Sequence, residues 1–282
     1  MECFIKQALK AVSVATDDPE TKMQALKAAS SHLAGIDVSK TPAEVATGIL
    51  KSVIEITSVK DAFYDLKKES NEKVAQLIPK LKNIIDGSED AFDTAVRISL
   101  CGNIIDHGIL EDFDVAELID REVSQNQDAD KIKDLKTIVM NSRNMSFIAD
   151  NAGEIGLDAL MLEEFTKLNP DLKINLFVRS IPLINDATID DAEFFGLQKK
   201  YDIIQYPDSV GFLMDGMPDH VAGVINGADI IISKGQANYE TLSRIDDGRI
   251  IFMLRTKCEV VAMDIGIPEG RPVILIKDWV SA

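Results

Sequence analysis

The stretch Phe-Ile-Ala-Asp-Asn-Ala-Gly-Glu, residues 147–154, decides how the chain is expected to fold. Its first three residues belong to a short apolar run, which is typical of a buried parallel strand. Two oxygen-bearing side chains, Asp150 and Asn151, come next, and Gly153 and Glu154 then open a segment with the apolar periodicity of a helix. A strand, a polar turn and a helix in this order place ligand-binding groups at the carboxyl edge of an open α/β sheet. Asp150 and Asn151 are therefore the first candidates for chemistry.

More β-rich runs follow in the second half of the chain, and helical segments separate them. This alternation predicts βαβ units, and hence an α/β fold with a mostly parallel sheet and helices on both faces. Right-handed crossovers then bring the carboxyl ends of the strands to one edge. The predicted strands are Ser146–Ala149, Ile174–Val178, Asp202–Gln205, Asp229–Ser233, Ile250–Leu254 and Val273–Ile276.

The first half of the chain has helical periodicity instead. We predict an all-helical N-terminal domain over residues 1–143 and an α/β domain over residues 144–282, and we interpret the polar run 131–144 as the connection between them. The clearest helical face, with apolar residues three and four apart, consists of Val74, Leu77, Ile78, Leu81, Ile84 and Ile85.

One run in the helical half, residues 101–108, interrupts this periodicity and contains Asn103 and Asp106 between two glycines. These two side chains could face a cleft shared with the second half. The run also fits a helix C-cap and turn, because Gly and Asn readily adopt positive φ. On the local sequence alone, the cap and turn is the favoured interpretation.

The charge balance excludes several partners. The 282 residues include 47 acidic and 30 basic side chains, for a net charge of -17, which repels nucleic acid and anionic membrane surfaces.

The three cysteines are far apart in the sequence and indicate neither a zinc knuckle nor a disulfide framework. No apolar run approaches the roughly 20 residues of a membrane span, so a cytoplasmic location is expected. The oligomeric state is left open.

Oxygen-bearing side chains gather at the predicted carboxyl edge. After the second strand, Asp186 precedes a helix whose start has Thr188 and Asp191 at capping-box spacing. Each of Asp150, Asn151 and Asp186 alone could be explained as a helix cap or a turn residue. Together, and next to lysines at the same edge, they favour a site for a hard divalent ion such as Mg²⁺ or Mn²⁺ rather than zinc.

Those lysines are Lys234, after the fourth strand, and Lys257, after the fifth. Lys234 and Gly235 open a helix, where free N–H groups and the helix dipole favour an anion. The pair is therefore a candidate phosphate cradle, although a solvated surface lysine is the commoner situation.

A metal, cations and a helix N-terminus together suit phosphoryl transfer or phosphate ester hydrolysis. A carboxylate must then accept the proton or attack phosphorus. Asp186 and Glu154 are candidates for this role, with Asp150 as the alternative nucleophile, and the sequence does not choose among them.

The competing class is a methyltransferase or dehydrogenase on a similar sheet. Those proteins have a Gly-rich turn after the first strand and an acidic residue after the second. Here the first turn contains one glycine, Gly153, and the second strand ends in Arg179. Both features count against a dinucleotide or S-adenosylmethionine site.

Taken together, the motifs of this chain resemble those of the DUF89 family, also called the damage-control phosphatase or ARMT1-like family, and most of all its short prokaryotic and archaeal branch. The similarity extends over nearly the whole chain. The motifs that carry it are Asn103-Ile-Ile-Asp106, Asp150-Asn-Ala-Gly-Glu154, Asn185-Asp-Ala-Thr188, Lys234-Gly-Gln-Ala-Asn-Tyr-Glu240 and Lys257-Cys-Glu-Val-Val-Ala262.

The resemblance implies a helical N-terminal part on a Rossmann-like α/β domain. It also implies a divalent metal, with Mn²⁺, Mg²⁺, Co²⁺ and Ni²⁺ as candidates, held by Asp150, Asn151 and Asp186. The implied activity is hydrolysis of a small phosphorylated metabolite, such as a sugar phosphate or a related damaged metabolite.

The same resemblance implies that Lys257 contacts the phosphate. It also implies that Asn103 and Asp106 face the cleft, in place of the cap and turn that the local sequence favours. Two alternatives stay open: an S-adenosylmethionine-dependent protein carboxyl methyltransferase, proposed for a eukaryotic branch, and a metal-binding module without catalysis. The full set of residues that we predict to bind substrate is Asn103, Asp106, Lys234, Asn238, Arg255 and Lys257.

Overall fold

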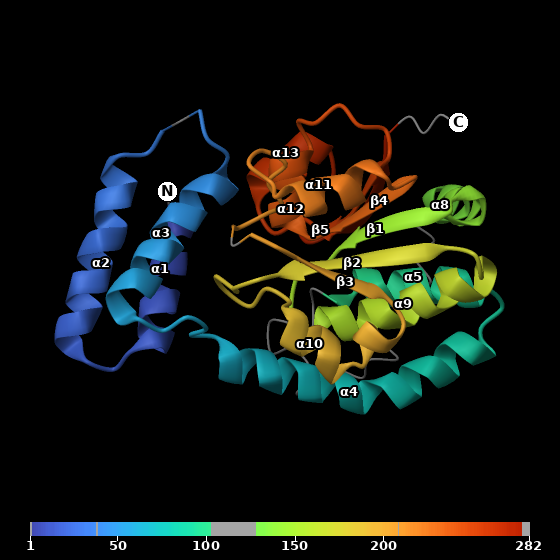
Figure 1. Ribbon diagram of the computed structural model, residues 1–282, viewed down its shortest axis with the longest axis horizontal. Helices are drawn as coiled ribbons and strands as arrows, with labels where there is room; N and C mark the ends of the chain where they lie inside the picture. The colour runs from blue at the N-terminus through green and yellow to red at the C-terminus, as the bar shows by residue number, and fades with distance from the viewer. Residues whose placement is uncertain (1, 38, 103–127, 208, 278–282) are drawn as a thin grey trace.

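A six-stranded sheet with the order β3-β2-β1-β4-β5-β6 forms the centre of the protein (Figure 1). The computed structural model describes residues 2–37, 39–102, 128–207 and 209–277. Strands β1 to β5 pair in parallel, and β6 runs antiparallel to β5, so the prediction of a mostly parallel sheet is confirmed. The strands are β1 (Asn144–Ile148), β2 (Lys173–Arg179), β3 (Asp202–Tyr206), β4 (Ile230–Lys234), β5 (Ile250–Arg255) and β6 (Pro272–Ile276).

Helices cover both faces of the sheet, as predicted (Figure 1). Successive side chains of a strand point to opposite faces. In β1, Phe147 accordingly belongs to the hydrophobic core on one face and Ile148 to the core on the other. The first face is covered by α9 (Glu154–Leu168), α10 (Ile189–Phe194) and the short helix η2 (Leu197–Lys199). The second is covered by α11 (Asp219–Asn226), α12 (Gln236–Leu242) and α13 (Glu259–Ile265).

Helices from the N-terminal half also pack on the first face. These are α4 (Tyr64–Gly87), α5 (Ala91–Leu100) and α8 (Ala129–Asn141). Val74, Leu81 and Ile85 of the predicted helical face are buried there, which confirms that prediction. Phe92 of α5 stacks on Phe165 of α9 with 5.0 Å between the ring centroids. The sheet and these helices therefore share one core.

The interpretation of residues 131–144 as a connecting stretch was wrong, because α8 occupies most of it. Ile132, Leu135, Ile138 and Val139 recur at helical spacing and are buried against the sheet core. Charged residues on the opposite face of α8 dominate the composition of the run and conceal this amphipathic pattern.

The first three helices form a unit of their own beside the α/β part (Figure 1). They are α1 (Glu2–Ala15), α2 (Pro19–Ala34) and α3 (Pro42–Thr57). Thr41 and Glu44 form a capping box at the start of α3. Leu183 and Val210, from loops at the carboxyl edge of the sheet, complete the core of this unit. The helical unit thus packs against the loops that carry the candidate site.

The boundary predicted between residues 143 and 144 remains a prediction. Packing groups α4, α5 and α8 with the sheet, whereas α1 to α3 have a separate core.

None of the helices in the described parts of the chain combines the length and the apolar character that crossing a membrane requires.

Candidate active site

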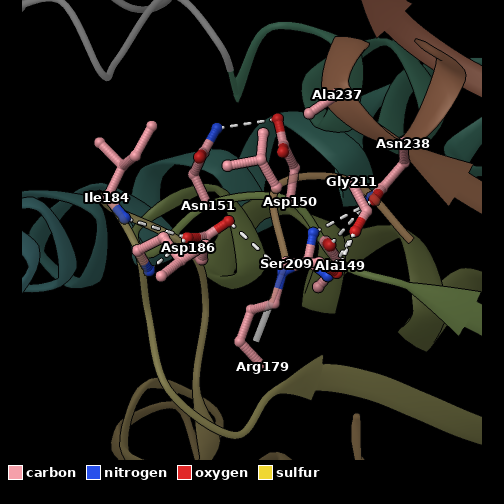
Figure 2. A network of polar contacts seen from close by, with 12 residues as sticks. Ala149, Asp150, Asn151, Arg179, Ile184, Asp186, Ser209, Gly211, Ala237 and Asn238 are labelled. Carbon is pink, nitrogen blue, oxygen red and sulfur yellow. Dashed lines mark hydrogen bonds and ion pairs between the residues drawn. The ribbon is translucent and has the colours of Figure 1, made fainter. Parts of the chain in front are cut away.

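Backbone hydrogen bonds bring the turn after β1 against the loop after β2. Figure 2 shows Asp150 and Asn151 of this turn and Asp186 of this loop. The N–H of Ala152 donates to the carbonyl of Asn185 at 2.9 Å, and the N–H of Ala187 donates to the carbonyl of Asp150 at 3.0 Å. Asn151 and Asp186 are paired as an isolated antiparallel bridge. The structure therefore brings together the three residues that the sequence predicted as metal ligands.

The carboxylate of Asp186 is held firmly. Its Oδ2 accepts hydrogen bonds from the backbone N–H groups of Leu183 at 3.0 Å and Ile184 at 3.1 Å. Its Oδ1 lies 3.4 Å from Nε of Arg179. These three donors fix the position of the carboxylate. The capping box predicted for the next helix, between Thr188 and Asp191, is present and anchors the end of the loop.

Asp150 and Asn151 offer the remaining oxygen atoms. Nδ2 of Asn151 donates to Oδ2 of Asp150 at 2.9 Å and lies 3.4 Å from Oε2 of Glu154, so the amide oxygen is the atom that can turn to a cation. The Asp150 carboxylate is half-buried and packs on Gly235. Two carboxylates and one carboxamide fit a hard divalent ion such as Mg²⁺ or Mn²⁺. Within the described ranges, no three His, Cys, Asp or Glu side chains are grouped so that they could hold a metal ion by themselves. A metal site formed by Asp150, Asn151 and Asp186 therefore needs the amide oxygen of Asn151 as its third ligand.

Gly235 makes room for the Asp150 carboxylate. Its φ is +83°, and a Cβ at this position would lie 2.1 Å from Cγ of Asp150. We expect Gly235→Ala to push the carboxylate aside and weaken Mn²⁺ binding by about tenfold or more. The strained backbone should also cost about 1–2 kcal/mol of stability. Calorimetric titration of Mn²⁺ and denaturant unfolding measure the two effects.

Gly266 provides the matched control, because its φ is +81° and no atom lies within 4 Å of the added Cβ. Gly266→Ala should lose similar stability and keep its affinity for Mn²⁺. Equal Mn²⁺ affinity in the two variants would contradict the close packing of Asp150 on Gly235.

Lys234 does not have the exposed position of a surface phosphate contact. Its side chain is 1% exposed, and its Nζ lies 2.7 Å from Oδ1 of Asp158, 2.6 Å from Oγ of Ser99 and 3.1 Å from Oε1 of Glu154. Burial by itself would lower the pKa of Lys234, but the two carboxylates outweigh burial and raise it above its ordinary value. Burial raises the pKa of Asp158 to about 6, although Lys234 opposes this shift.

Glu154, a candidate catalytic carboxylate, connects this buried cluster to the turn after β1 that carries Asp150 and Asn151. It is 3% exposed, and its two oxygens lie next to Lys234 on one side and Asn151 on the other. Gly102 packs against it so closely that a Cβ there would lie 2.5 Å from Cγ of Glu154. The carboxylate is therefore fixed between Gly102, Asn151 and Lys234.

Asn238, a predicted substrate contact, is also fully buried. Its Nδ2 donates to the carbonyl of Lys234 at 2.7 Å and to that of Ala149 at 3.3 Å, and its Oδ1 lies 3.4 Å from Nη2 of Arg179. The sequence reasoning had used Arg179 only as evidence against a nucleotide site and missed its contacts. A charged residue at the end of an apolar strand was the available signal.

The cations after β5 differ from each other in exposure. Nη1 of Arg255, a partly buried side chain, donates to the carbonyl of Gly270. Lys257 is exposed, and no ion pair joins its ammonium to any residue within the described ranges. Its backbone N–H donates to Oε1 of Gln236 at 2.7 Å, a contact that the sequence reasoning missed. Asn103 and Asp106 lie outside the described residues.

Comparison with known proteins gives a consistent result along the chain. A family model described as the damage-control phosphatase ARMT1-like domain matches residues 1–273. A damage-control phosphatase of Archaeoglobus fulgidus is 34% identical, over 96% of this chain and 95% of that protein. A damage-control phosphatase of Pyrococcus horikoshii is 31% identical, over 98% of this chain and 96% of that protein. The crystal structure of a DUF89 family protein from Pyrococcus horikoshii superposes with a TM-score of 0.85 at 28% identity, covering 98% of this chain and 96% of that one. The chain therefore belongs to the damage-control phosphatase ARMT1-like family, as its motifs predicted.

Proposed function

We propose that this protein is a metal-dependent phosphatase that hydrolyses a small phosphorylated metabolite. The observation that carries the proposal is the set of oxygen atoms from Asp150, Asn151 and Asp186, brought together by the backbone bridge between the loops after β1 and β2. The relatives named damage-control phosphatases, which match this chain nearly end to end, support it.

Asp150, Asn151 and Asp186 would hold the divalent ion. When bound, such an ion neutralises charge on the phosphoryl oxygens and acidifies a water molecule. We propose that Lys257, which is exposed after β5, meets the phosphate, and we keep Arg255, partly buried at the end of β5, as a second candidate. The enclosed side chains of Lys234 and Asn238 are better suited to positioning than to substrate contact.

The three candidate catalytic carboxylates differ in accessibility. Glu154 and Asp186 are 3% and 9% exposed, whereas Asp150 is half-buried. Asp186 is already engaged by two backbone N–H groups, and Glu154 lies against Lys234. We therefore propose Asp150 as the carboxylate that meets substrate. We propose that Glu154, which is buried, holds the turn after β1 in place through its contact with Asn151. Asn103 and Asp106 stay predicted substrate contacts, and the cytoplasmic location also stays a prediction.

Phosphate release after metal removal and replacement tests this function. The protein is stripped with chelator, and Mn²⁺, Mg²⁺, Co²⁺ or Ni²⁺ is added back singly with p-nitrophenyl phosphate and a panel of sugar phosphates. We expect no release from the stripped protein and restored release with at least one ion. The kcat/KM values would then rank the substrates.

Each alternative predicts a different result. Metal binding without release from any ester would indicate a metal-binding module. Saturable binding of S-adenosylmethionine in calorimetry without metal would indicate the methyltransferase and would overturn the phosphatase proposal.

A further inference from the structure

We propose that Arg179 and Asn238 form a positioning clamp that sets the separation of the two aspartates of the metal site. Here the clamp means these two side chains and their mutual contact. This inference rests on the proposed function only in taking Asp150 and Asp186 as metal ligands. It assigns both clamp residues a role without substrate contact.

Arg179 contacts three different segments through the three nitrogens of its guanidinium (Figure 2). Nε lies 3.4 Å from Oδ1 of Asp186, Nη1 donates to the carbonyl of Gly211 at 2.9 Å, and Nη2 lies 3.4 Å from Oδ1 of Asn238. The planar, rigid fork of an arginine suits contacts in fixed directions. One side chain at the end of β2 thus links the metal ligand on the next loop to two distant segments.

Asn238 extends these links to the other half of the sheet. Its amide donates to the carbonyl of Lys234 at the end of β4 and to the carbonyl of Ala149, the residue directly before Asp150. Because β1 lies between β2 and β4, the clamp spans the carboxyl ends of three adjacent strands. A displacement of Arg179 would therefore change the position of Asp186 relative to Asp150.

The surroundings of Arg179 keep it inside the protein. The residue is 3% exposed, and its guanidinium lies 4.2 Å from the ring centroid of Tyr206, its register neighbour on β3. This cation–π contact stabilises the charge and fixes the plane of the fork. With all three nitrogens engaged and the face covered, the guanidinium cannot serve as the phosphate contact, so Arg179 is a positioning residue.

Mn²⁺ binding by metal-stripped variants, measured by calorimetry, tests the clamp. Residues that orient ligands of a metal typically contribute 10–100-fold to affinity, so we expect a loss of about this size in Arg179→Met and in Asn238→Ala. Arg179→Lys keeps the charge and loses the fork, and it should also bind at least about tenfold more weakly. The double variant should be about as weak as the weaker single variant, because the two residues act through one network.

Arg249→Met is the matched control. The guanidinium of Arg249 is also bound by a carboxylate, that of Asp247, and by backbone carbonyls, but it lies at the opposite end of the sheet, before β5. This variant should lose stability and keep wild-type affinity for Mn²⁺. Circular dichroism and thermal unfolding establish which variants are folded, and Arg179→Lys keeps the test decisive if Arg179→Met does not fold.

The outcomes separate the clamp from the proposed function. Wild-type affinity in folded Arg179→Lys or Asn238→Ala would overturn the clamp, as would equal weakening in Arg249→Met. Wild-type protein that binds Mn²⁺ but hydrolyses no ester would overturn the phosphatase proposal alone, and affinity would still decide on the clamp. Wild-type protein that binds no divalent ion would overturn both.

Discussion

Asp150→Ala should abolish metal-dependent phosphate release while the fold stays intact. Asp150 is one of only two carboxylates in the proposed metal site, and it is the more exposed of the two. Losing several kcal/mol of charge stabilisation corresponds to a decrease of about 10³-fold or more in kcat/KM. Phosphate release at saturating Mn²⁺ measures the effect.

The stability of metal-free Asp150→Ala should not fall with its activity. In the absence of metal, Asp150 adds negative charge close to Asp186, so its removal should leave the unfolding temperature unchanged or raise it slightly. Added Mn²⁺ should stabilise the wild type by linkage and have little effect on the variant. Asp202→Ala, which removes an exposed aspartate from the opposite edge of the sheet, should keep both activity and the metal response. Metal-restored activity in Asp150→Ala would contradict the metal assignment.

Lys234→Met should destabilise the protein by about 3–5 kcal/mol, because removing one partner of a buried ion pair leaves the other charge uncompensated. Lys234 contacts Asp158 and Glu154, and all three side chains are almost completely buried. Denaturant unfolding of the metal-free protein measures the loss. A surface lysine that binds phosphate would instead raise KM and leave the stability unchanged.

The loss should also depend on pH. The pKa of Asp158 is raised to about 6 from an ordinary value of 3.8, so the folded state holds this proton more tightly than the unfolded chain. Stability from this group is therefore present at low pH and is lost as the pH rises through the folded pKa. Lys234→Met removes the cation that opposes this rise, so the pKa of Asp158 should rise further in the variant. The loss of stability with rising pH should then continue toward neutral pH. The variant should be more strongly destabilised at pH 8 than at pH 5.

A second substitution checks that Asp158 is responsible. Asp158→Asn in the Lys234→Met background removes the titrating group, so the difference between pH 5 and pH 8 should shrink. Lys199→Met, at an exposed position, is the control and should cost less than about 0.5 kcal/mol. A destabilisation of Lys234→Met as small as that of Lys199→Met would contradict the buried ion pairs.

The sequence determined the sheet and the polar turn after β1, because both depend on local patterns. Short β-rich runs that alternate with helical segments predicted the six strands of the sheet to within two residues at their ends. The positions of Asp150, Asn151 and Asp186 after two of these runs predicted that they lie at one edge of the sheet. Parallel strands with right-handed crossovers leave these residues no other edge to occupy. The motifs also identified the family.

Only the tertiary structure decided what Lys234, Asn238 and Arg179 do. Ser99 lies 135 residues before Lys234, and Asn238 lies 59 residues after Arg179, so no local pattern records these contacts. A lysine that opens a helix has the same local sequence whether solvent or two carboxylates surround it. Burial and long-range packing make the difference, since removing a charge from water requires a partner that the fold brings from elsewhere.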